Sequence, residues 1–204
     1  MEKVESLILI ATLVAVISSA FIGYTLVPGK VKSIEFNAPA VTLDGSGTLG
    51  SFKMTLIPGT GKTLVNIENA AFYSDVENSF RKAKLNAEGI LGVKLAYYDL
   101  ILEAKRVNVV SGESAGAVLT AAIVALATDH TFDASATGSA GISKDGSVFA
   151  VGGIEEKILA AHSAGKKTFI IAQDQHIQNA DKLPTDIEIV RVATARELVD
   201  RLVV

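Results

Sequence analysis

A pattern of strand, tight turn and buried helix between Val107 and Ala127 points to an α/β protein. Residues 107–110 read Val-Asn-Val-Val, a composition that favours a strand. Residues 117–127 are alanine-rich and apolar, which favours a buried helix. The turn between them is built mostly of small residues. It places Ser114 at or near the N-terminus of the helix.

A serine at the start of a buried helix has the surroundings of a nucleophile. Unpaired backbone N–H groups and the helix dipole point at that position. The same amides can hold the oxyanion that forms when the hydroxyl attacks a carbonyl group. The serine also needs a base, and no histidine lies close to it in sequence. The candidate base is Lys157, 43 residues later. The alternative is that Ser114 only caps the helix.

Lys157 lies on the apolar face of its predicted helix. At about 100° per residue, Ile154 lies about 60° away from it and Ala161 about 40°, whereas Glu155 lies about 160° away on the solvent side. Burial disfavours a charged amine and lowers its pKa. The neutral amine can then take a proton from Ser114. The alternative is a lysine whose stem covers the apolar face while its amine reaches water.

Five short segments, in this order, resemble the proteolytic domain of Lon proteases, a family that uses a Ser–Lys dyad. They are Gly112–Gly116, Ala136–Gly138, Gly146–Val148, Val151–Lys157 and Ala160–Gly165. The order of the motifs and the 43-residue gap between serine and lysine match the family. The resemblance runs from about residue 34 to residue 204, and it is specific between residues 107 and 171.

The resemblance implies a fold and a set of site residues. The expected fold is α/β (α+β), a ribosomal-protein-like α/β sandwich. Ser114 is expected to be the nucleophile and Lys157 the general base, with Thr137 near the lysine to orient it. Backbone amides around Gly112 to Ser114 are expected to stabilise the oxyanion. Glu113 either shapes the substrate entrance or pairs with Lys157 in a resting state.

The resemblance also carries departures and expected partners. The residues Ser-Gly-Glu precede the serine, where bacterial members commonly have Lys-Asp-Gly-Pro. This sequence shows no ATPase module, so any unfolding power is expected to come from elsewhere or to be absent. The resemblance is to a membrane-anchored, archaeal-type homologue without such a module. The expected substrate is a peptide or an unfolded protein, handled by a ring, commonly a hexamer, alone or with a separate ATPase. The rival interpretation is a catalytically silent, membrane-tethered scaffold or partner-binding domain.

The N-terminal segment from Leu7 to Val27 contains 21 residues without a charge. As a helix it would span about 31 Å, close to the thickness of the hydrocarbon core of a bilayer. We therefore predict an anchor in residues 1–29, a proteolytic domain in residues 30–204, and a single-pass membrane protein. The alternative is a signal peptide cleaved near Ala20, which would release the domain as a secreted protein. The flanking charges leave both orientations open.

Composition excludes several kinds of site. The sequence has no cysteine, so it forms neither disulfides nor thiolate metal sites. It carries a net charge of −3 and no basic stripe with interleaved aromatic residues, which argues against nucleic acid as a partner. Asp129–Asp133 contains one histidine and two aspartates but is read as a loop, and no cofactor or metal is expected. Gly59–Thr63 resembles the end of a phosphate-binding loop, yet Leu56 stands where that motif needs glycine. We read it as a hairpin turn and keep nucleotide binding as a third hypothesis.

The remaining periodicity predicts further elements. Strands 31–36, 48–57 and 63–67 are expected to form an antiparallel unit. The other predicted elements are a helix at 74–88 capped by Ser74 or Asp75, a strand at 98–102, a strand pair within 137–151 turning at 144–146, a helix ending at Gly165, strands at 168–172 and 186–190, and a C-terminal helix at 194–202 capped by Thr194.

Overall fold

The computed structural model describes residues 30–66, 70–105 and 113–204. The chain divides into two units, Met1–Lys30 and Val31–Val204, and the described helices and strands all lie in the second. The predicted membrane segment at 7–27, the predicted strand at 107–110 and Gly112 lie outside the described residues. Within the described ranges, no helix is long and apolar enough to cross a membrane.

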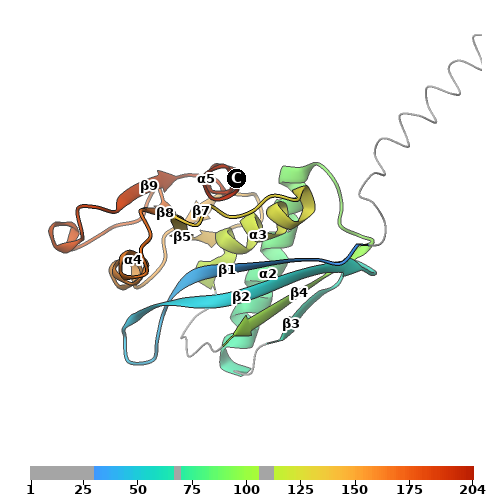
Figure 1. Cartoon of the computed structure of the whole chain (residues 1–204), viewed down its shortest axis with the longest axis horizontal. Helices are drawn as coiled ribbons and strands as arrows, with labels where there is room; N and C mark the ends of the chain where they lie inside the picture. The colour runs from blue at the N-terminus through green and yellow to red at the C-terminus, as the bar shows by residue number, and fades with distance from the viewer. Residues whose placement is uncertain (1–29, 67–69, 106–112) are drawn as a thin grey trace, which may run out of the picture. The chain divides into compact units, whose positions relative to one another are not determined.

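The first sheet has four strands in the order β1-β2-β4-β3 (Figure 1). Strands β1 (Lys32–Val41) and β2 (Gly47–Pro58) form an antiparallel hairpin, as predicted. Alternation along β2 puts Phe52, Met54 and Leu56 on one face, and all three are buried. That face supplies the core on which the helices pack.

The predicted antiparallel unit is wrong at its third strand. Strand β3 (Thr63–Asn66) pairs in parallel with β4 (Tyr98–Lys105), which lies between β2 and β3. The connection from β2 to β3 is therefore not a hairpin turn. The Asp99 carboxylate, at the start of β4, accepts hydrogen bonds from the N–H groups of Thr60 and Lys62, both at 2.8 Å. These bonds fix the turn on β4, and residues 70–91 supply the helical crossover that parallel neighbours need.

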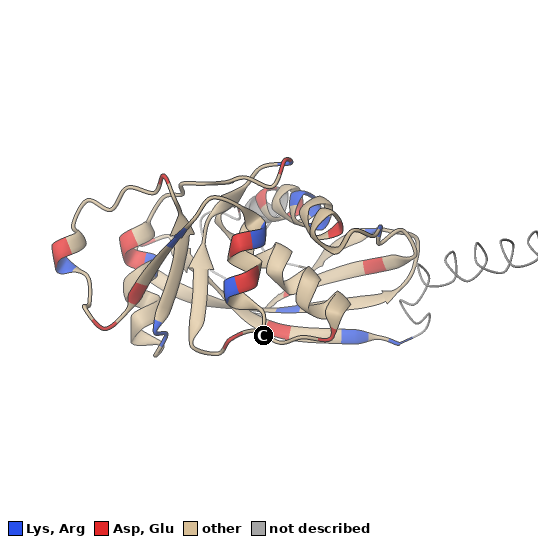
Figure 2. Ribbon diagram, turned by 90° about the horizontal axis from the view of Figure 1, so that it is seen from above, with Lys and Arg blue, Asp and Glu red and all other residues tan. Residues whose placement is uncertain are grey.

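Two helices pack together behind the sheet. Helix α2 (Ala70–Leu91) begins before Ser74, so the predicted cap is wrong. Two alanines at its start favour the helix and extend it by a turn. Its predicted apolar stripe is confirmed, because Val76, Phe80, Ala83 and Ala87 are all buried. Helix α3 (Gly116–Thr128) is buried from its first residue to Leu126 and carries no charge. Other helices do carry charged residues, for example α5 (Ala195–Leu202), which lies beside the C-terminus in Figure 2.

The second sheet is parallel, with the order β5-β8-β9, and a short hairpin precedes its crossover helix. The elements are β5 (Ala136–Ser139), β6 (Gly141–Ile142), β7 (Val148–Phe149), α4 (Ile154–Ser163), β8 (Thr168–Ala172), the 3₁₀ helix η2 (Ala180–Lys182), β9 (Glu188–Val192) and α5 (Ala195–Leu202). The predicted turn at 144–146 lies between the paired strands β6 and β7 and is confirmed. The predicted cap at Thr194, whose hydroxyl accepts from the Glu197 N–H group, is confirmed as well.

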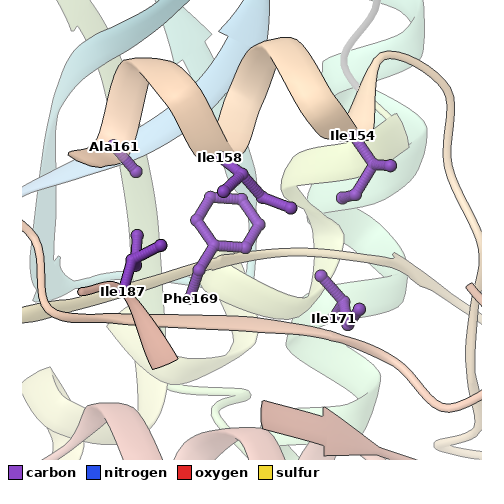
Figure 3. Packing of buried hydrophobic residues seen from close by; sticks show 6 residues of the cluster. All are labelled: Ile154, Ile158, Ala161, Phe169, Ile171 and Ile187. Atoms are coloured by element: carbon purple, nitrogen blue, oxygen red, sulfur yellow. The ribbon is translucent and has the colours of Figure 1, made fainter. Parts of the chain in front are cut away.

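A small apolar core fixes helix α4 against β8. Ile154, Ile158 and Ala161 point from α4 toward Phe169 and Ile171 of β8, with Ile187 beside them (Figure 3). Because one face of α4 is held in this way, the angular position of every residue on the helix is fixed. The prediction of an α/β (α+β) fold is confirmed.

Candidate active site

Ser114 and Lys157 line the same cavity, which has a volume of about 570 Å³. Ser114 comes from the start of α3 and Lys157 from the second turn of α4. The rest of the wall comes from the β1–β2 loop and from the segment between β7 and α4. Its other residues are Val41, Thr42, Leu43, Gly45, Glu113, Phe149, Ala150, Val151, Gly152 and Gly153.

Ser114 sits in a short 3₁₀ helix, Glu113–Ala115, that leads directly into α3. The capping residue of α3 is Ala115, and no side chain caps this helix end. The alternative in which Ser114 is only a cap is therefore wrong. Ser114 is buried, and its carbonyl oxygen lies 3.5 Å from the hydroxyl of the buried Ser139. Ser114 lines the wall of the cavity, and its role as nucleophile stays a prediction.

Lys157 is buried, with 4% of its surface exposed, and its side chain lines the cavity. Burial lowers the pKa of Lys157 from 10.5 to about 8, and the negative charge of Glu156 partly opposes this shift. The amine donates a hydrogen bond of 2.8 Å to the carbonyl oxygen of Gly152. A substantial neutral fraction near physiological pH is what a general base requires.

The structure gives positions for two of the three predicted supporting residues, Thr137 and Glu113. Thr137 is buried on β5, with its hydroxyl 3.5 Å from the carbonyl oxygen of Asn37, and its role in orienting Lys157 remains a prediction. Glu113 lies at the mouth of the cavity and is exposed. Its carboxylate is 3.9 Å from the amine of Lys82, on α2. The predicted contribution of Gly112 falls on a residue that the structure does not describe.

Sequence reasoning did not predict that the β1–β2 loop forms one wall of the cavity. Leu43 at its tip is 80% exposed. The loop is held by Asp44, whose carboxylate accepts from the hydroxyl groups of Thr42 and Ser46. These bonds lower the pKa of Asp44 to about 2, with the Thr42 hydroxyl as the largest cause. The sequence signal that could have identified this loop is an apolar residue, Leu43, inside an otherwise polar turn.

Gly59–Thr63 does not have the arrangement of a phosphate-binding loop. The N–H groups of Thr60 and Lys62 already donate to Asp99, and the Lys84 amine donates to the Gly61 carbonyl oxygen. A strand follows the loop, where a nucleotide loop would open a helix. Among the residues with a described position, no cluster of three or more His, Cys, Asp or Glu side chains could hold a metal ion.

Comparison with known proteins gives a consistent family. Residues 107–204 match the family model for the Lon protease (S16) C-terminal proteolytic domain. The chain is 39% identical over 77 residues to the mitochondrial Lon protease homolog of Yarrowia lipolytica, covering 38% of this chain and 6% of that protein. It is 48% identical over 62 residues to a Lon protease of Syntrophus aciditrophicus, covering 29% and 8%. A Lon protease of Erwinia amylovora is 25% identical over 146 residues, covering 69% and 18%.

The chain thus spans less than a tenth of the length of the first two of these relatives. The mixed α/β architecture fits a Lon proteolytic domain, and the matched proteins are Lon proteases. The matched region contains both Ser114 and Lys157. Residues 107–204 of this chain are therefore similar to the Lon protease (S16) C-terminal proteolytic domain.

Proposed function

We propose that this protein is a serine endopeptidase in which Ser114 is the nucleophile and Lys157 the general base. The observation that carries the proposal is that these two side chains, 43 residues apart in sequence, line one cavity, and that the lysine there is buried. The pKa of about 8 for Lys157 supports a role in proton transfer, because an amine with the ordinary pKa of 10.5 would stay protonated at neutral pH.

The reaction proceeds through an acyl-enzyme. The neutral amine of Lys157 takes the proton of Ser114 as the serine oxygen attacks the peptide carbonyl carbon. Backbone N–H groups around residues 112–114 stabilise the oxyanion. The C–N bond then breaks, and Lys157 returns the proton to the leaving amine. A water molecule next attacks the ester carbonyl carbon and gives a proton to Lys157. The bond between this carbon and the Ser114 oxygen then breaks, Lys157 returns the proton to that oxygen, and the free carboxylic acid leaves.

The proposed substrate is a peptide or a segment of an unfolded protein, since a folded chain would not enter a cavity of about 570 Å³. The similarity of residues 107–204 to the Lon proteolytic domain supports assembly into a ring, commonly a hexamer, because the resemblance to that family implies such a ring. Within such a ring the domain acts on short or unfolded peptides, or a separate ATPase supplies it with unfolded chains. The oligomeric state in solution, measured by light scattering, tests the ring.

We further propose a single-pass membrane tether of the archaeal type, formed by residues 7–27. The uncharged length of 21 residues supports it, since it matches the thickness of a bilayer core. Fractionation of cells that express the full chain tests the tether. Recovery of the intact chain in the membrane fraction after a carbonate wash is the expected result. A shortened chain in the soluble fraction would indicate cleavage near Ala20.

Covalent labelling tests the dyad. The full chain in detergent is treated with a β-lactone, which acylates serine hydroxyl groups, and the modified residue is found by mass spectrometry. We expect labelling of Ser114, no labelling at this position in Ser114→Ala, and a rate lowered by at least about a hundredfold in Lys157→Ala. Ser163→Ala, which changes an exposed serine on α4, serves as the matched control and should label normally. A folded wild-type chain that stays unlabelled across the pH range would favour the silent scaffold instead.

A further inference from the structure

The lysine of the proposed dyad follows a segment whose residues allow an unusually wide range of backbone conformations. Gly152 and Gly153 stand immediately before α4, and Gly153 has a φ of +64°. Two adjacent glycines give the backbone more conformational freedom than any other pair. The carbonyl oxygen of Gly152 is also the acceptor for the Lys157 amine. Any movement of this segment therefore moves the amine.

The loop after β8 contacts this segment on its N-terminal side. Gln175 is 7% exposed, and its side-chain carbonyl oxygen accepts a hydrogen bond of 2.7 Å from the Val151 N–H group. Its amide nitrogen donates to the His176 carbonyl oxygen at 3.1 Å. The backbone of Gln175 is itself fixed, because its carbonyl oxygen accepts from Arg191 of β9 at 2.7 Å. The bond to Val151 therefore connects the cavity wall to the second sheet.

The same loop contacts the segment on its C-terminal side. Glu155, in the first turn of α4, accepts hydrogen bonds from the N–H groups of Gln178 and Asn179, at 2.7 and 3.0 Å. Its second oxygen accepts from the side-chain amide of Asn179 at 2.9 Å. These bonds lower the pKa of Glu155, with the Asn179 side chain as the largest cause and Lys182 contributing its charge. Hydrogen bonds of a carboxylate to N–H groups are among the stronger ones in proteins.

The two contacts lie on either side of the glycine pair. Val151 is held just before Gly152, and Glu155 just after Ile154, by one loop of seven residues, 173–179. We propose that this loop is a clamp, and that Gln175 and Glu155 are positioning residues that fix the Gly152 carbonyl and hence the Lys157 amine. This inference rests on the proposed function, since it concerns the geometry of the same dyad. Ile177, which packs against the apolar core of α4, adds a nonpolar contact from the clamp.

The clamp makes a prediction that differs from that of simple destabilisation. If the segment loosens, water reaches the Lys157 amine, and its pKa rises from about 8 toward 10.5. The midpoint of the pH–rate profile would then move upward. A variant that is merely less stable lowers the folded fraction without moving this midpoint. Removal of the negative charge of Glu155 would by itself lower the pKa of a nearby lysine. The upward shift of the midpoint that a loosened segment predicts therefore has the opposite sign to this charge effect.

A graded set of variants tests the clamp in the full chain in detergent. Glu155→Ala removes all three acceptor contacts, whereas Glu155→Gln keeps the oxygen that accepts two of them. Gln175→Met keeps the volume and removes the bond to Val151. Asp174→Asn changes an exposed charge in the same loop and is the matched control. The rate of β-lactone acylation of Ser114 is measured as a function of pH. Amide hydrogen exchange of residues 151–157 is measured in parallel.

We expect Glu155→Ala and Gln175→Met to lower the maximal acylation rate about tenfold and to raise the midpoint, because small displacements of reacting groups cost one to two orders of magnitude. Glu155→Gln should show a smaller effect, and Asp174→Asn none. Exchange at residues 151–157 should be faster in the first two variants only. Unchanged midpoints, or unchanged exchange, would overturn the clamp. If even the wild-type chain is not acylated, the proposed function fails, and the exchange measurement still decides the clamp by itself.

Discussion

The amine of Lys157 lies 2.8 Å from the carbonyl oxygen of Gly152, a neutral acceptor five residues earlier in the chain. Within the described part of the chain, no carboxylate forms an ion pair with this lysine. A carbonyl oxygen orients the amine without holding its proton as firmly as a carboxylate would. Burial therefore dominates, and the pKa falls to about 8.

The pH dependence of Ser114 acylation follows from this relationship. The rate should rise with pH and reach half of its maximum near pH 8, where Lys157 becomes neutral. Glu156 raises the pKa of Lys157 by its charge, so Glu156→Gln should move the midpoint to lower pH and increase the rate at pH 7. The measurement is the acylation rate between pH 6 and 10. A midpoint that moves upward in this variant would contradict the assignment of the base.

Removal of the lysine should stabilise the protein while it abolishes the reaction. The folded pKa of about 8 lies below the ordinary 10.5. The unfolded chain therefore binds more protons between these pH values, and stability rises with pH there. Below pH 8 the full cost of burying the charge is present, about 3 kcal/mol.

Lys157→Met removes that cost but loses the hydrogen bond to Gly152, about 1 kcal/mol. We expect a net gain of about 2 kcal/mol in the free energy of unfolding at pH 7 and little gain at pH 9.5. Urea unfolding at both pH values measures this, with the exposed Lys144→Met as control. A loss of stability at pH 7 would show that the lysine is not buried as a costly charge.

Glu113 should have little influence on the titration of Lys157. In the structure its carboxylate faces the Lys82 amine at 3.9 Å, and the side chain is half-exposed. An exposed pair of this kind contributes at most about 1 kcal/mol, so Glu113→Gln should change the free energy of unfolding by less than that. The midpoint of Ser114 acylation should equal that of the wild type. A clear shift to lower pH would instead reveal a resting state in which Glu113 pairs with Lys157.

A glycine on β2 should matter for the lysine helix. A Cβ atom on Gly47 would lie 1.9 Å from the carbonyl oxygen of Glu156, so Gly47→Ala must push β2 and α4 apart. We expect a loss of about 1–3 kcal/mol in stability and a lower acylation rate. The control is Gly89→Ala within α2, where a Cβ atom meets nothing within 4 Å. That substitution should stabilise the protein by about 0.5–1 kcal/mol. Thermal unfolding of both variants compares the two effects.

The sequence predicted the elements well where the apolar periodicity was long. The stripe of α2 and the buried face of α4 were both readable, because each repeats over several turns. It failed to predict the partner of β3. Local alternation indicates that residues 63–66 form a strand, but the strand that pairs with it depends on Asp99, more than 30 residues later.

The two dyad residues could be identified from motifs and helical spacing, whereas the residues around them could not. Leu43 lines the cavity because the β1–β2 loop forms part of its wall. Gln175 and Glu155 meet Val151 and Asn179 through a loop that no periodicity describes. Contacts of this kind are set by tertiary packing, and a pattern of local preferences carries no information on them.

The position of β4 between β2 and β3 has a consequence for the order in which the chain can fold. The β1–β2 hairpin needs only neighbouring residues and can form as soon as they are available. Among the described strands β3 pairs only with β4, so it must wait until the α2 crossover is complete. Ser114 follows β4 within ten residues. Closure of this sheet is a nonlocal and therefore slow step, and we expect the nucleophile to take its place only after it. A newly made chain should remain proteolytically inert while it is still unfolded itself.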